Sequence, residues 1–124
     1  MTTGFKELDA TVTLGEQMQD EDSGPIVLIN LFTIAPEEAD ALIAAWAHDA
    51  AFMKEQPGYI STQLHRGLAG STTFINYAIW ESAADFRAAF SNPVFQSRIA
   101  QYPQSAVATP HLFRKVAVGR LCTA

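Results

Sequence analysis

The sequence is poor in cysteine and in charge, and it contains no long apolar run. Its 124 residues include one cysteine, Cys122, which excludes an internal disulfide framework and a multi-cysteine metal site. No apolar segment reaches the ~20 residues of a membrane helix, and the polar first ten residues lack the apolar stretch of a secretory signal. We therefore expect a cytoplasmic protein with no membrane partner. The hydrophobic content of 48% suits one core and one domain.

Positive charge is also scarce, and the formal net charge of −5 is unevenly placed. Residues 1–24 carry six acidic side chains against one base, Lys6, whereas the remaining hundred residues carry seven of each sign. The sequence thus predicts an acidic N-terminal extension, residues 1–24, followed by a neutral body. A neutral body offers no basic stripe for nucleic acid and no cationic face for a membrane surface. A small, mostly apolar ligand is the partner that this composition favours.

Hydrophobic periodicity predicts four strands and three helical segments. Only residues 10–14 of the extension have β character, which indicates a short edge strand or arm. In the body, strands are expected at 26–34, 59–68, 72–80 and 111–118, and helices at 36–55, after Ser82 and after Asn92. The order β-α-β-β-α-β is that of a ferredoxin-like α+β sandwich with helices on one face of the sheet.

The first helix has an apolar stripe at spacings of three and four residues. The residues assigned to this stripe are Ala39, Leu42, Ile43, Trp46, Ala50 and Met53. His48 and Asp49 are expected outside it. The strand at 26–34 is apolar on both faces although helices cover only one, so the other face needs a cover. A second copy of the same sheet is the simplest cover, which predicts a homodimer.

Asparagine interrupts two of the apolar strands. Asn30 lies in the middle of the first, and Asn76 shares a face with Trp80 on the third. Buried amides are costly without partners. These three side chains could therefore form a polar cluster in an apolar pocket, with Trp46, Phe86 and Phe90 as its walls. Alternatively, Asn30 and Asn76 satisfy each other or nearby backbone, and Trp80 is ordinary core.

None of the three histidines has the spacing of a metal motif, so no metal site is predicted. His65, on the second strand, has a side chain suited to proton transfer near neutrality. We keep it as a candidate substrate-binding residue or base, with a surface histidine as the favoured alternative. No nucleotide fingerprint and no serine or cysteine nucleophile motif occurs.

Three segments resemble the antibiotic biosynthesis monooxygenase family of dimeric α+β barrel proteins. They are IVLINLFTIAPEEADALIAAW, QPGYISTQLHRGL and FINYAIWESAADFRAAFSNPVF, within about residues 25–119, which leaves residues 120–124 as a tail. The most telling part is Asn-x-x-x-Trp-Glu-Ser, from Asn76 to Ser82. The resemblance implies a homodimer with a ligand cavity between sheet and helices in each subunit.

The similarity extends to anthrone oxygenases of this family, which implies O₂-dependent oxidation of a phenol, anthrone or quinol without a cofactor. The matching asparagine and tryptophan place the catalytic role on Asn76 and Trp80. An electron-rich phenolate or enolate can itself reduce O₂, so the protein need only favour deprotonation and stabilise the oxyanion. Phe86 and Ala100 stand where some of these enzymes have a tyrosine and an arginine, so a proton relay through those positions is not expected.

Two other functions remain open within the same fold. Heme-degrading monooxygenases resemble this chain at Asn30, but Ile99 stands where their iron-ligating histidine would be. The other alternative is a dimer that binds a small molecule without turning it over, because a fold does not fix a function.

Overall fold

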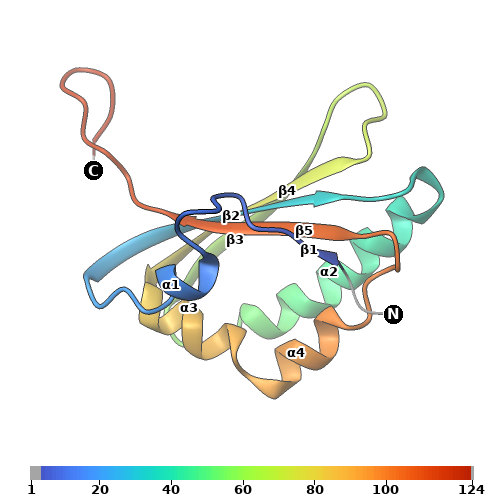
Figure 1. Ribbon diagram of the computed structural model, residues 1–124, viewed down its shortest axis with the longest axis horizontal. Helices are drawn as coiled ribbons and strands as arrows, with labels where there is room; N and C mark the ends of the chain where they lie inside the picture. Colours follow the sequence, from blue (N-terminus) through green and yellow to red (C-terminus); the bar gives the residue numbers. More distant parts are fainter. Residues whose placement is uncertain (1–3, 124) are drawn as a thin grey trace.

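The computed structural model describes residues 4–123 as a curved sheet with helices beneath it (Figure 1). The elements in chain order are β1 (Gly4–Phe5), α1 (Leu14–Gln17), β2 (Ser23–Thr33), a 3-10 turn (Pro36–Glu38), α2 (Ala39–Met53), β3 (Tyr59–Arg66), β4 (Thr73–Ser82), α3 (Ala83–Phe90), α4 (Pro93–Ile99) and β5 (Val107–Phe113). No helix in this described part of the chain is both long enough and apolar enough to cross a membrane.

The five strands form one sheet in the order β1-β5-β2-β4-β3. All neighbouring pairs are antiparallel except β1 with β5. Helices α2, α3 and α4 lie on one face of this sheet (Figure 1). From β2 onward, with α3 and α4 taken together as one helical connection, the order is β-α-β-β-α-β, so the predicted ferredoxin-like fold is confirmed.

Local signals in the sequence place the helix starts. The side chain of Ser82 accepts a hydrogen bond from the Asp85 N–H, and Asn92 does the same for Val94, so each caps a helix where the sequence predicts one. Pro36 begins a 3-10 turn, and the α-helix itself starts three residues later, at Ala39. This helix ends at Met53, two residues before the predicted end.

The last strand differs most from its prediction: it spans Val107–Phe113 instead of 111–118. It contains Pro110, opposite Asn30 of β2. On the side of β5 that faces β1, the Lys6 N–H donates to Ala108 O. The next hydrogen bond on this side is the one that the Leu112 N–H donates to the Gln17 side chain. Pro110 falls in the gap between them, so its missing N–H removes no bond and the strand tolerates it.

The acidic N-terminal segment packs against the body. Its strand is Gly4–Phe5, and the expected strand at 10–14 is wrong, because Thr13 caps helix α1 and Leu14 begins it. Leu14 is 2% exposed and belongs to the core. The Gln17 carboxamide accepts from Leu112 N at 2.9 Å and donates to Leu112 O at 2.9 Å, as a neighbouring strand would. The segment thus extends the sheet edge beside β5.

Candidate active site

A pocket lies between the helices and the covered face of the sheet. Its volume is about 140 Å³, roughly ten times the space that one water molecule needs. The lining combines β1 (Gly4, Phe5), β2 (Leu28, Asn30, Phe32), α2 (Trp46, Asp49, Ala50, Met53), β3 (Tyr59, Thr62), β4 (Asn76, Ala78, Trp80), α3 (Phe86, Phe90), α4 with the following turn (Phe95, Ile99, Tyr102) and β5 (Ala108, Pro110).

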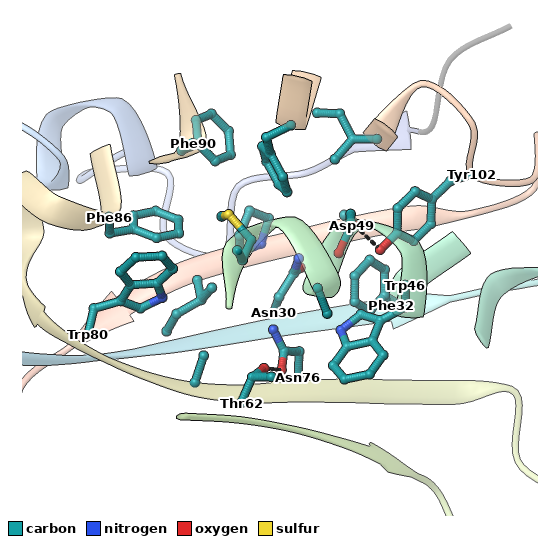
Figure 2. A pocket seen from close by; sticks show the side chains of 18 of the residues that line it. Asn30, Phe32, Trp46, Asp49, Thr62, Asn76, Trp80, Phe86, Phe90 and Tyr102 are labelled. Atoms are coloured by element: carbon teal, nitrogen blue, oxygen red, sulfur yellow. Dashed lines mark hydrogen bonds between the residues drawn. The ribbon is translucent and has the colours of Figure 1, made fainter. Parts of the chain in front are cut away.

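Aromatic side chains form the wall at one end of the pocket (Figure 2). Trp80 lies edge-on to Tyr59 and to Phe86, with ring centroids 5.7 Å apart in both pairs. Phe86 contacts Phe90, which contacts Phe95, at 5.6 Å each. Trp80 is 1% exposed, so the packing fixes its ring. This wall presents flat apolar surface to a ligand.

Two amides stand between this wall and the opposite end (Figure 2). Asn30 of β2 is directly opposite Asn76 of β4. The Thr62 hydroxyl donates to Asn76 Oδ1 at 2.5 Å, which leaves the Asn76 amide N–H group facing the pocket. Asn30 Oδ1 is buried without a hydrogen-bond partner in the described part of the chain. The expectation that the two asparagines satisfy each other is therefore wrong, and both keep hydrogen-bonding capacity for a ligand.

A carboxyl group lies at the other end of the pocket. Asp49 of α2 is 7% exposed and accepts a hydrogen bond from the Tyr102 hydroxyl. Burial raises the pKa of Asp49 to about 7, against the lowering effects of this hydrogen bond and of the Arg98 charge. Burial and the adjacent carboxylate raise the pKa of Tyr102, so its hydroxyl stays protonated. Tyr102 also stacks on Phe32, 5.6 Å between centroids.

Most of the candidate residues meet here. Six of the seven proposed from the sequence line the pocket, namely Asn30, Trp46, Asn76, Trp80, Phe86 and Phe90. His65 does not, and its expected place in the site is wrong. It pairs with Ile75, whereas the pocket face of β3 carries Thr62 opposite Ala78. The His65 side chain is exposed and its Nδ1 lies 3.1 Å from Gln63 O.

The sequence reasoning missed Asp49. It was placed outside the apolar stripe, whereas Ile43, placed inside, is 37% exposed. Its spacing is one signal, because Asp49 is three residues after Trp46 and four before Met53, and all three line the pocket. Nothing local, however, indicates the Tyr102 hydroxyl that a buried carboxyl uses as its partner here. Tyr102, which follows α4, is likewise absent from the candidates named from the sequence.

The donor set in the pocket is not that of a metal or heme site. No group of three or more His, Cys, Asp or Glu side chains that could hold a metal converges in residues 4–123. The described pocket lining includes Ile99 and contains no histidine or cysteine that could ligate a heme iron.

The fold and the site define an α+β protein with a small-molecule pocket, and sequence comparison names its family. A sequence profile described as "Antibiotic biosynthesis monooxygenase" matches residues 25–101. The chain belongs to this family.

Two relatives with assigned names are similar in sequence. Tetracenomycin-F1 monooxygenase of Streptomyces glaucescens is 35% identical over 72 residues, which is 56% of this chain and 62% of that protein. Deoxynogalonate monooxygenase of Streptomyces nogalater is 30% identical over 76 residues, 60% of this chain and 62% of that protein. The match thus spans about three fifths of the length of these relatives.

Solved structures agree with the fold. SnoaB, described as a cofactor-independent oxygenase from Streptomyces nogalater, superimposes with a TM-score of 0.68 at 25% identity, covering 79% of this chain and 99% of its own. A candidate monooxygenase from Shewanella loihica PV-4 gives a TM-score of 0.65 at 36% identity, covering 78% and 99%.

Proposed function

We propose that this chain is a cofactor-independent monooxygenase that uses O₂ to oxidise a small phenol, anthrone or quinol. The observation that carries the proposal is the pair Asn30 and Asn76, two amides with unused hydrogen-bonding capacity inside an aromatic pocket. The proposal is supported by two Streptomyces relatives named as monooxygenases and by the similar structure of SnoaB, which is described as a cofactor-independent oxygenase.

The pocket suits a flat aromatic molecule with oxygen substituents. The rings of Trp80, Phe86 and Phe90 give such a molecule apolar contact. The free N–H of Asn76 can donate to a carbonyl or phenolate oxygen, and Asn30 Oδ1 can accept from a neighbouring hydroxyl. A substrate with a carbonyl and a hydroxyl side by side would satisfy both amides.

The oxidation needs little from the protein beyond deprotonation and charge stabilisation. Once the substrate is an enolate or phenolate, it can pass an electron to O₂, and the resulting radicals combine to form a C–O bond. In an anthrone, the ring CH₂ then becomes C=O and the second oxygen atom leaves as water, so the substrate supplies all four electrons that reduce O₂. Asn76 and the Trp80 indole N–H are the donors that would stabilise the developing oxyanion.

We further propose that the active form is a homodimer packed through the uncovered sheet face. Tyr77 of β4 is on this face opposite Ile29 of β2, and Phe113 of β5 is opposite Val27. Tyr77 is 40% and Phe113 41% exposed, which leaves aromatic surface open to solvent in the single chain. A second copy of the sheet would cover this surface.

Isotope labelling tests the function. The protein is incubated under ¹⁸O₂ with a hydroxylated anthrone, and the product is analysed by mass spectrometry. The proposal predicts a quinone that carries one ¹⁸O atom from O₂, formed faster than by spontaneous oxidation. A ligand that raises the melting temperature yet is never oxidised would instead identify a binding protein.

A further inference from the structure

The proposed oxidation requires a proton acceptor, and the two residues implicated by sequence cannot provide one. Asn76 and Trp80 carry an amide and an indole, neither of which takes up a proton near neutral pH. Thr62 and Asn30 are equally unable to do so. Among the side chains that line the described pocket, only Asp49, Tyr59 and Tyr102 titrate.

Asp49 is the member of this set with the geometry of a base. It projects from α2 into the pocket, beside Tyr102 and on the side away from Trp80 (Figure 2). Its Oδ2 accepts the Tyr102 hydroxyl hydrogen bond, which fixes the carboxyl group in place. No cation lies within salt-bridge distance of Asp49 in the described part of the chain, so its charge is not held in an ion pair.

The other elements around Asp49 bring little charge to it. β2 and β4 present the neutral amides Asn30 and Asn76, while β1, β5 and α3 line the pocket with apolar residues. Arg98 of α4 attracts the carboxylate, but its guanidinium does not line the pocket and donates to His48 O at 2.7 Å. His48 is exposed. Burial outweighs this attraction and holds the pKa of Asp49 at about 7, where a carboxyl can both take and return a proton.

We propose that Asp49 is the catalytic base of the pocket and that Tyr102 is its positioning residue. The inference rests on the proposed function and assigns its proton-transfer step. The Asp49 carboxylate takes a proton from the substrate O–H or activated C–H bond, and the electron pair of that bond stays on the substrate as an enolate or phenolate. After O₂ has added, the protonated Asp49 returns the proton to the substrate peroxide. Loss of the remaining C–H proton and of hydroxide then gives C=O and one water.

Asp49→Asn tests the assignment, because asparagine has nearly the same shape and can still accept from Tyr102. At pH 7.5 its rate of O₂ uptake with the anthrone should fall at least 100-fold, as for other general bases. The wild-type rate should rise with pH through a midpoint near 7. Tyr102→Phe should keep part of the activity and move this midpoint upward, because the lost hydrogen bond favours the ionised form. Asp40→Asn, on the exposed side of α2, is the matched control and should behave as the wild type.

An anaerobic titration separates this proposal from the monooxygenase function. Without O₂, the wild type should convert bound anthrone to its coloured enolate at pH 7.5, and Asp49→Asn should not. If the wild type forms the enolate anaerobically but takes up no O₂ in the aerobic assay, the assignment of Asp49 as the base holds and the monooxygenase function is rejected. Wild-type rates and an unchanged pH profile in Asp49→Asn would overturn the assignment, as would equal enolate in both proteins.

Discussion

Asn30 and Asn76 face each other across adjacent central strands, yet neither satisfies the other. Asn76 Oδ1 accepts a hydrogen bond from the Thr62 hydroxyl of the next strand, and Asn30 Oδ1 has no hydrogen-bond partner in the described part of the chain. A buried amide oxygen without a partner costs about 1–3 kcal/mol. A ligand hydroxyl that donates to it would recover this free energy, which makes the arrangement costly for a core and useful for a binding site.

Loss of the oxyanion donors should reduce turnover without unfolding the protein. We expect Asn76→Ala to lower kcat by about 100-fold, as removal of one such donor does elsewhere. Trp80→Phe removes the indole N–H and keeps most of the wall, so kcat should also fall. The measurements are steady-state O₂ uptake and thermal melting. Asp40→Asn, at an exposed position of α2 outside the pocket, is the control. Normal turnover in both site variants would show that Asn76 and Trp80 have no catalytic role.

Stability should depend on pH through Asp49. Its pKa is about 7 in the folded protein and near the ordinary 3.8 when unfolded, so the folded state binds more protons between these values. The stabilising effect is complete below about pH 4 and is lost as pH rises through 7, by a few kcal/mol as an order of magnitude. Asp49→Asn should not show this loss of stability, because the asparagine side chain does not titrate.

Urea unfolding of the wild type and Asp49→Asn at pH 5 and pH 8 checks this dependence. Other carboxyl groups contribute equally to both proteins and cancel in the difference. The variant should gain stability relative to the wild type from pH 5 to pH 8. A difference that is the same at both pH values would contradict the elevated pKa.

Docking of the N-terminal segment should depend on Gln17. Its carboxamide makes two hydrogen bonds with the backbone of Leu112, so Gln17→Ala removes the partner of the Leu112 N–H and a donor to the Leu112 carbonyl. We expect a loss of about 1–3 kcal/mol in the free energy of unfolding, measured with urea. Gln19→Ala, at an exposed position in the same segment, should change little. Equal stability of the two variants would show that Gln17 does not hold the segment.

A charge on the uncovered sheet face should prevent dimer formation. Tyr77→Glu puts a carboxylate at the centre of the proposed interface, where it would be desolvated without a partner. Sedimentation velocity should give a dimer for the wild type and a monomer for the variant. Ala44→Glu, at an exposed position of α2 on the helix-covered side of the sheet, adds the same charge as a control. A wild-type monomer at micromolar concentration would reject the interface.

The sequence predicted what local periodicity controls and failed where distant contacts decide. Strand parity placed Asn76 and Trp80 on one face, and in the structure both line the pocket. Asp49 is expected outside the apolar stripe because a carboxylate on a helix is usually exposed to solvent. Its partner Tyr102 is 53 residues away, and no local pattern reveals the pair. His65 was misplaced for a related reason, since the register of β3 against β4 is not encoded in β3 alone.

The N-terminal segment illustrates the same limit. Its acidity predicts an N-terminal extension, and the contact that docks this segment joins Gln17 to Leu112, 95 residues apart. Composition describes the charge of a segment and carries no information on the backbone edge that the segment meets.

The rate of O₂ uptake by the pure, colourless, metal-stripped protein tests the central claim most directly. With a hydroxylated anthrone as substrate, we expect one O₂ consumed per quinone formed, no released hydrogen peroxide, and a rate that collapses in Asn76→Ala. Uptake no faster than spontaneous oxidation, with the anthrone bound in the pocket, would contradict the claim that this site catalyses oxygenation without a cofactor.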